Sequence, residues 1–296
     1  MKNQPLVSIC IPTYNGADYI VQAMDSALAQ TYPNLEIVVS DDASIDATLE
    51  LIASYKTKTS IPIYIHHHTP NGIGANWNHC VRKANGEYIK FLFQDDVLLP
   101  ECVALMVAVL EQHQTIALVA SKREFIVESS YLNDTSKAWI DTYNDLQCTL
   151  DYPVKNAIQV LNRSLFKHQS YFDSPRNKVG EPSTLLFRTS LLDTVGYFRE
   201  DLKQILDYEF YNRVLKRYSI AIMQEPLVKF RLHGQQATVL NKNNDQTDYV
   251  IYDRLMYDDY LWSLNKDMRL YFLKKYNPFV RLVFKGLKRL KRLQWK

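Results

Sequence analysis

The chain has 296 residues, 47% of them hydrophobic and 23% charged, with a formal net charge of +3. This balance is typical of ordinary soluble globular proteins and excludes an intrinsically disordered chain. No stretch approaches the roughly 18 consecutive apolar residues of a membrane span, and we expect no secretory signal. The four cysteines lack the C-x-x-C spacing of a zinc site and are expected to be reduced thiols of a cytoplasmic protein.

Short apolar runs alternate with helical patterns from residue 6 to about 120, which predicts parallel strands joined by crossover helices. The expected strands are 6–11, 35–40, 62–66, a run from Gly86 that ends in two aspartates, and one ending near Ala120. The expected helices are 17–30, a segment capped by Ser44 or Asp46 and ending at Tyr55, 76–84, and one starting near Pro100.

Residues 121–180 show no clear periodicity and are rich in Tyr, Asn, Asp and Ser, which predicts loops over a binding face. Regular patterns return at 183–187, in helices at 189–195 and 207–218, and in strands around Ile220 and at 227–232. Past about residue 240 the pattern is helical only. We therefore expect one domain over 1–238, with halves at 1–120 and 121–238, and a helical extension over 239–296.

Asp95 and Asp96 follow the apolar run that starts at Gly86. Carboxylates at a strand tip face the crevice in which open α/β sheets bind ligands. Two adjacent anions repel each other unless a cation lies between them, so the pair predicts a divalent metal that also binds phosphates. The alternative is that one aspartate caps the helix near Pro100 and the other is solvated.

Two further turns follow predicted strands. Residues 12–16, Pro-Thr-Tyr-Asn-Gly, precede a helix and can present amides to a phosphate or a base. They lack the G-x-G-x-x-G fingerprint, which argues against a nicotinamide cofactor. In the second turn, Ser40 to Ser44, Asp42 can accept hydrogen bonds from a nucleobase while Asp41 turns inward to support the loop. Plain turn chemistry is the alternative explanation, because Asp and Ser are favoured in turns.

Taken together, these motifs make residues 5–238 resemble the family 2 glycosyltransferases of the GT-A fold. The matching segments, in the order of that family, are Pro12–Gly16, Asp41–Ser44, Asn71–Asn78, Gly86–Ile89, Asp95–Asp96, Gly180–Ser183 and Arg231–His233. The resemblance implies an α/β fold, the Rossmann-like GT-A architecture, with a mostly parallel sheet flanked by helices. It also implies transfer of a sugar from a nucleotide-diphosphate sugar.

The resemblance assigns roles to individual residues. The expected nucleotide-sugar ligands are Pro12, Thr13, Tyr14, Asn15, Asp42, Asn78, Asp95 and Arg231, and the expected ligands of Mn²⁺ or Mg²⁺ are Asp95, Asp96 and His233. Two departures weaken the match. Phe93 and Gln94 stand where the family often has Asp-Ser, and Asn76-Trp77 stands where it usually has Ala-Arg.

An inverting transfer needs a carboxylate that takes the proton of the acceptor hydroxyl. In the family this acid opens a helix, which here predicts Asp207 as the general base, with Glu209 as the alternative and Glu181 positioning the acceptor. An N-terminal helix aspartate is also explained by the helix dipole alone. Two other functions compete with this one. The first is a sugar nucleotidyltransferase, which needs a basic residue in the phosphate loop after the first strand; this chain has none there. The second is a non-catalytic nucleotide-sugar-binding or membrane scaffold protein.

The C-terminal segment 274–296 carries nine basic residues and no acidic ones. Leucines and aromatic residues recur between them at near-helical spacing, which is the pattern of an amphipathic helix on an anionic membrane surface. The alternatives are a solvated terminal helix and a nucleic-acid patch; the apolar content favours the membrane, and no nucleic-acid partner is expected. We expect a cytoplasmic enzyme, peripheral on the inner face of the membrane, that acts on a saccharide or lipid-linked saccharide in polysaccharide biosynthesis.

Overall fold

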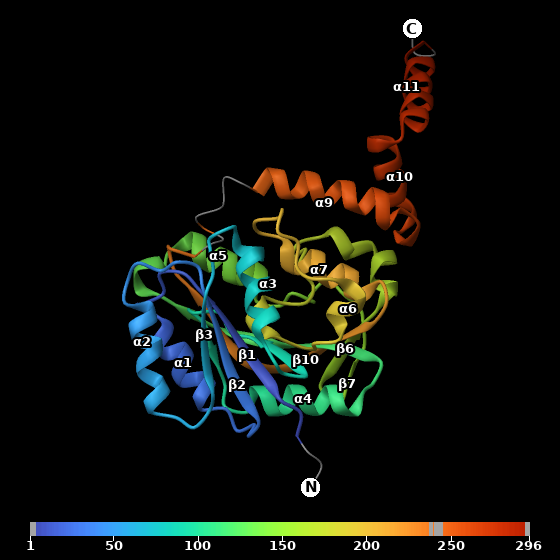
Figure 1. Ribbon diagram of the computed structural model, residues 1–296. Coiled ribbons are helices and arrows are strands. Elements are labelled where there is room, and N and C mark those ends of the chain that lie inside the picture. Colours follow the sequence, from blue (N-terminus) through green and yellow to red (C-terminus); the bar gives the residue numbers. More distant parts are fainter. Residues whose placement is uncertain (1–3, 237–238, 240–244, 294–296) are drawn as a thin grey trace.

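The computed structural model describes residues 4–236, 239 and 245–293, with side chains for all of these except 245–246 and 287–293. It is an α/β structure in which helices cover both faces of a central mixed sheet (Figure 1). The strand order is β3-β2-β1-β4-β9-β6-β10-β8-β7, and β5 pairs with β10. The predicted domain boundary at 238 lies outside the described residues.

The N-terminal half confirms the predicted alternation of strands and helices. Its parallel strands are β1 (Val7–Thr13), β2 (Leu35–Asp41), β3 (Ile63–His67) and β4 (Tyr88–Phe91), connected by α1 (Ile20–Leu28), α2 (Thr48–Ser54) and α3 (Ile73–Lys83). Successive strand residues point to opposite faces. Ile9 and Ile11 pack in a core with α1, α2 and α4 (Cys102–Gln112), whereas Cys10 packs in a second core with α3.

The strand predicted to end near Ala120 is longer than expected, because β6 (Ile116–Val127) continues through Lys122 and Arg123. It pairs in parallel with β10 (Ser219–Leu232), and this long partner supplies hydrogen bonds where the sequence is no longer apolar. Between β4 and β6 lies β9 (Leu185–Arg188), which is antiparallel to both. The sheet is therefore mixed rather than uniformly parallel.

The segment predicted to consist of loops is partly regular. It contains α5 (Asp134–Tyr143) and the hairpin of β7 (Val154–Lys155) and β8 (Ile158–Leu161). A capping box between Asn133 and Ser136 starts α5. Ser136 is the only residue of α5 that is buried. The apolar periodicity by which such a helix is recognised in a sequence is therefore weak here.

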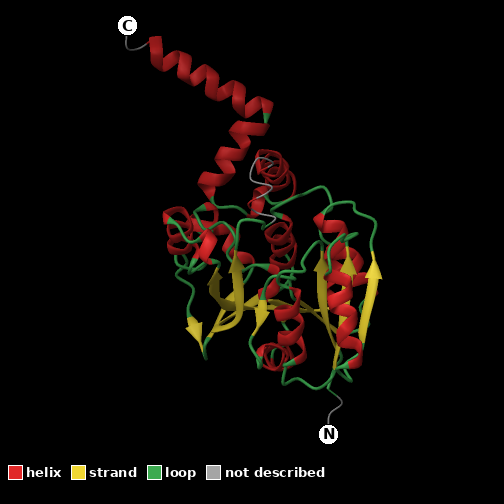
Figure 2. Cartoon of the chain, turned by 90° about the vertical axis from the view of Figure 1, so that its left-hand side faces the viewer, coloured by secondary structure: helices red, strands yellow, loops and turns green. Residues whose placement is uncertain are grey.

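The C-terminal segment is helical, as predicted, with α9 (Asp245–Asp259), α10 (Lys266–Tyr276) and α11 (Pro278–Leu293). α9 packs on the domain, since Tyr252 and Met256 belong to the same core as α6 (Leu191–Val195) and α7 (Leu206–Leu215). α10 and α11 lead away from the domain (Figures 1 and 2). Among the described residues, none of the helices combines the length and apolar content needed to cross a bilayer.

Candidate active site

A cavity of about 350 Å³ opens where β1 and β2 end and the loop after β4 begins. Pockets at the carboxyl ends of strands are the usual ligand sites of α/β sheets. The wall draws on both halves of the domain. It is lined by Pro12, Thr13, Tyr14, Asp42, Ile73, Asn76, Trp77, Phe93, Gln94, Asp95, Glu181, Pro182, Lys203, Gln204, Leu206, Asp207, Phe230, His233, Gln235 and Gln236.

Asp41 and Asp42 lie in different surroundings. Asp41 is buried and turns inward, where its carboxylate accepts hydrogen bonds from the Thr13 hydroxyl at 3.1 Å and from the Ser44 amide and hydroxyl at 2.9 and 2.6 Å. Asp42 faces the cavity, and its Oδ1 lies 2.7 Å from Nδ1 of His68. The turn is thus rigid, with one carboxylate left at the cavity wall.

Tyr14 is the exposed end of the first turn, with 56% of its surface accessible. Its backbone is held by Gln94, whose Oε1 accepts from the Tyr14 amide at 2.8 Å and whose Nε2 donates to the Tyr14 carbonyl at 3.0 Å. At this position, where the chain departs from the family motif, Gln94 thus connects the first turn to the acidic turn.

Two predicted nucleotide-sugar ligands have other partners and do not line the cavity. Asn15 accepts from the Ile45 amide through Oδ1 at 2.9 Å, so it braces the neighbouring turn. Asn78 lies inside α3 and is buried, with its amide bonded to both the carbonyl and the amide of Phe198 and to Glu200. The contacts of Asn78 span about 120 positions of sequence, which is why local pattern could not reveal them.

The acidic turn separates its two aspartates. β4 ends at Phe91, so the pair lies on the following turn rather than at the strand tip. Asp95 lines the cavity, and its Oδ2 lies 3.0 Å from Nε2 of His233. Asp96 points the other way, is 1% exposed, and accepts from the Arg231 amide at 3.0 Å through Oδ1. Burial, and then the charge of Asp95, raise the pKa of the Asp96 carboxyl well above its ordinary value.

Arg231 is also turned away from the cavity. Its guanidinium donates to the Asp95 carbonyl at 2.8 Å, to Glu128 at 2.7 Å and to Gln22, and it lies over the ring of Tyr19. Each of its three side-chain nitrogens thus has a hydrogen-bond partner. In this structure neither Arg231 nor Asp96 lines the cavity, and Oδ2 of Asp96 is buried without a hydrogen-bond partner among the described groups.

Asp95 and His233 are the two predicted metal ligands that face the cavity. Within the described part of the chain, three or more His, Cys, Asp or Glu side chains do not gather into a metal-binding group. A carboxylate and an imidazole still suit Mn²⁺ or Mg²⁺, because such ions in nucleotide sites are completed by substrate phosphates and water. Nδ1 of His233 is buried without a hydrogen-bond partner in the described structure.

Asp207 lies in the first turn of α7 and lines the cavity. Its Oδ2 accepts a hydrogen bond from Asn177 Nδ2 at 2.9 Å, while Oδ1 is buried and has no partner among the described groups. Burial, assisted by the charge of Glu181, raises the pKa of Asp207 to about 7. A carboxylate with this pKa and a free oxygen suits a general base near neutral pH.

Two other carboxylates near Asp207, those of Glu181 and Glu209, have different partners. Glu181 lines the cavity and forms an ion pair of 2.6 Å with Nε of Arg123, which is itself buried. Glu209 points elsewhere and binds Arg213 at 2.9 Å, away from the cavity. Of the two acids on α7, Asp207 lines the cavity and Glu209 does not.

Comparison with known proteins gives one consistent family. The model of glycosyl transferase family 2 matches residues 8–196. An uncharacterized glycosyltransferase of Rickettsia typhi is 31% identical over 234 residues, which cover 79% of this chain and 66% of that relative. The chain thus spans just under two thirds of this relative's length.

Two solved structures have the same fold. S. aureus TarS 1–349 in complex with UDP-GlcNAc aligns with a TM-score of 0.60 and 18% identity, over 92% of this chain and 80% of that one. The mannosyltransferase PcManGT of Pyrobaculum calidifontis, in complex with GDP-Man and Mn²⁺, aligns with a TM-score of 0.60 and 17% identity, over 97% of this chain and 81% of that one. At these identities the likeness concerns the fold, which is the GT-A fold of glycosyltransferases.

Proposed function

Because the chain belongs to glycosyl transferase family 2, we propose that it transfers a sugar, with inversion, from a UDP-linked donor to a saccharide or lipid-linked saccharide acceptor. The observation that carries this proposal is that two groups of residues, one suited to a nucleobase and one to a general base, line the same cavity. Thr13, Tyr14 and Asp42 form the wall suited to a nucleobase, and Asp207 with its unpartnered Oδ1 forms the other. The UDP-GlcNAc complex of TarS supports uridine as the base.

In this proposal Asp207 takes the proton of the acceptor hydroxyl as that oxygen attacks the anomeric carbon. Its pKa of about 7 lets it be ionised at neutral pH while still basic enough to accept a proton. Glu181, fixed by Arg123, holds another hydroxyl of the acceptor. The carboxylate of Asp42 accepts a hydrogen bond from the base, and Tyr14 covers it.

Asp95 and His233 would hold Mn²⁺ or Mg²⁺. The ion would neutralise charge on the leaving diphosphate. The Mn²⁺ complex of PcManGT supports the use of a metal in this fold. Nε2 of His233 and Oδ2 of Asp95 lie 3.0 Å apart, so both side chains could serve one ion.

We also place the protein at the inner face of a membrane, through α11. Phe279, Leu282 and Val283 are 80%, 71% and 60% exposed, although they are large and apolar. Lys274, Lys275, Arg281 and Lys285 lie beside them in sequence. The other basic residues of the predicted segment lie where side chains are not described. An exposed apolar face among cations suits an anionic membrane, and a membrane site would bring the enzyme to lipid-linked acceptors of polysaccharide biosynthesis.

Donor turnover tests the catalytic proposal. Wild type and Asp207→Asn are incubated with UDP-sugars and Mn²⁺ in the presence of a saccharide panel, and UDP release and UDP affinity are measured separately. A catalyst loses turnover by at least 100-fold in the variant and keeps its UDP affinity. A non-catalytic scaffold binds nucleotide in both forms and releases no UDP in either, which would refute the catalytic role.

Vesicle binding tests the membrane proposal independently. Deletion of residues 274–296 should abolish sedimentation with anionic vesicles and leave sedimentation with neutral vesicles at background. Unchanged binding of the truncated protein would refute the role of this segment.

A further inference from the structure

The charges on the cavity wall do not match a nucleoside diphosphate. Asp42, Asp95, Glu181 and Asp207 are four carboxylates, and Lys203 is the one lysine or arginine among the described lining residues. A diphosphate placed among four carboxylates needs cations beside it. A divalent ion supplies only part of that charge, since the leaving diphosphate gains one further negative charge when its bond to the sugar breaks.

Arg231 is the basic residue that the sequence resemblance assigns to the nucleotide-sugar, but its guanidinium already has other partners, and Arg231 does not line the cavity. Its guanidinium is shared among Gln22, Glu128 and the Asp95 carbonyl. Lys203, in contrast, is exposed on the cavity wall, and no described group bonds to its ammonium. Among the described residues, Lys203 donates a hydrogen bond through its backbone amide, to Oδ2 of Asp248.

The backbone around Lys203 is firmly anchored. Oδ2 of Asp248, a buried residue of α9, accepts from the amides of Lys203, Gln204 and Ile205 at 2.9, 2.7 and 3.3 Å. The same segment leads directly into α7 and Asp207. The ammonium of Lys203 is therefore carried by a rigid loop on the wall that also presents the proposed base.

From these observations we infer that Lys203 binds the diphosphate of the donor and stabilises the charge that develops on it as the sugar leaves. This inference rests on the proposed function, because it takes the cavity to be a nucleotide-sugar site. A fixed cation that meets charge formed during the reaction contributes more to the transition state than to the bound donor. Lys203 would thus replace the cationic role that Arg231 does not fill.

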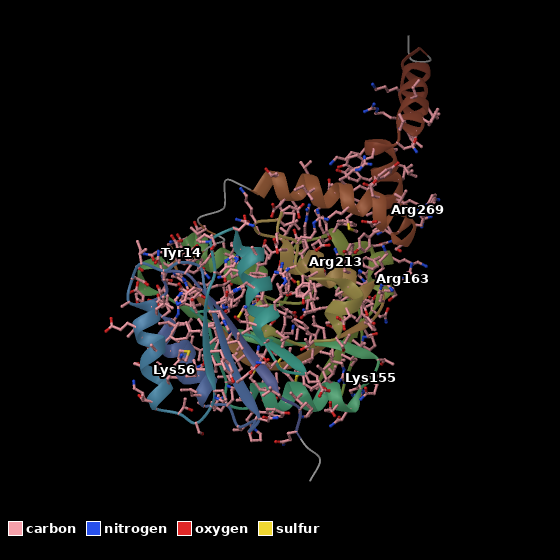
Figure 3. The ribbon with its side chains drawn as sticks, in the orientation of Figure 1. Tyr14, Lys56, Lys155, Arg163, Arg213 and Arg269 are labelled. Atoms are coloured by element: carbon pink, nitrogen blue, oxygen red, sulfur yellow. The ribbon has the colours of Figure 1, made fainter. Side chains whose placement is uncertain are left out.

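Affinities for UDP, UMP and uridine, measured by calorimetry with Mn²⁺, test the inference. In Lys203→Ala the affinity for UDP should fall about tenfold or more, because a charge-assisted hydrogen bond is lost. The affinity for uridine should change less than twofold, and Lys203→Arg should recover most of the UDP affinity. Lys155→Ala is the matched control, since Lys155 is exposed and lies across the domain from Tyr14 (Figure 3).

Each other outcome overturns the inference. Equal UDP affinity in wild type and Lys203→Ala would assign the lysine to the acceptor side. An equal loss for UDP and uridine would show that the substitution disturbs the loop and not a phosphate contact. If the wild type binds none of UDP, GDP, CDP and ADP, the proposed donor site itself is wrong. If the wild type binds UDP and Lys203→Ala binds it equally well, only the role of Lys203 is wrong.

Discussion

Asn177 donates a hydrogen bond of 2.9 Å to Oδ2 of Asp207 and leaves Oδ1 of that carboxylate without a partner. Asn177 is itself fixed, because its Oδ1 accepts from the amides of Val179 and Gly180 and its Nδ2 also reaches the Gly180 carbonyl. One oxygen of the proposed base is therefore used for orientation, and the other remains for chemistry.

The raised pKa of Asp207 predicts the pH dependence of both activity and stability. Turnover should rise about tenfold per pH unit below pH 7 and level off above it, since only the ionised carboxylate accepts a proton. The folded state binds the proton more tightly than the unfolded chain, so this group favours folding at low pH. That contribution is lost as pH rises from about 4 through 7, at up to about 1.4 kcal/mol per unit.

Asp207→Asn removes this titration, and the comparison isolates it. The free energy of unfolding of the variant, relative to wild type, should increase between pH 4 and pH 7 and stay constant above pH 8. Denaturant unfolding at a series of pH values measures it. Parallel pH curves for the two proteins would show that Asp207 titrates normally.

Asn177→Ala should shift the rising limb of the activity profile to higher pH. The amide of Asn177 stabilises the charged form of Asp207, so its removal raises the pKa of the carboxyl further. Asn162→Ala serves as a control, because Asn162 bonds only locally, to the Ser164 amide. A lower turnover with an unshifted profile would mean that Asn177 acts on the loop alone.

Asp95 and Asp96 should differ sharply when each is replaced by Asn. Asp95→Asn should lose most of the Mn²⁺ enhancement of UDP binding, because Asp95 faces the cavity beside His233. Asp96→Asn should keep it, since Asp96 is buried and its Oδ1 serves the Arg231 amide, a role that an asparagine oxygen can fill. Calorimetry with and without Mn²⁺ measures both variants. The reverse pattern would restore Asp96 as the metal ligand.

The contrast between these two aspartates shows how far sequence reasoning reaches. Adjacent acids after a strand indicate a site, but which of them faces the cavity depends on the Arg231 amide, 135 positions away. Asp41 could be predicted to turn inward because its partners Thr13 and Ser44 belong to neighbouring turns of one repeating pattern. The orientation of Asn78 could not be predicted, because it depends on hydrogen bonds to the backbone of Phe198, which is distant in sequence.

The same limit explains the residues that the sequence analysis missed. Lys203 and His68 belong to none of the matched segments, and Gln94 occupies a position at which this chain departs from the family motif. Gln94 and His68 gain their significance from distant contacts, Gln94 with Tyr14 and His68 with Asp42. Only the substitution at Gln94, where the family often has a serine, gave a local signal.

Asp248 predicts that the C-terminal helices support catalysis directly. Asp248→Ala leaves three amides at 203–205 without their acceptor and removes a buried carboxylate, which should lower the free energy of unfolding by about 2–4 kcal/mol. Turnover should fall as well, because this loop positions Lys203 and the start of α7. Asp258→Ala on the same helix is the control, because its pair with Arg254 is largely exposed and its loss should change the free energy of unfolding far less. Equal stability of the two variants, measured by denaturant unfolding, would refute the anchoring role.

The apolar face of α11 predicts a second kind of dependence. Phe279→Glu with Leu282→Glu should weaken binding to anionic vesicles at least tenfold, because two side chains that would enter the interface become charged. Val154→Glu, an exposed valine on β7, should leave vesicle binding unchanged. Since α11 projects away from the domain (Figure 1) and none of its described residues lines the cavity, turnover of a soluble acceptor should be equal in all three proteins. Cosedimentation measures vesicle binding, and UDP release measures turnover. If the double variant still binds vesicles, the apolar face is not needed, and the binding comes from electrostatic attraction of the basic residues.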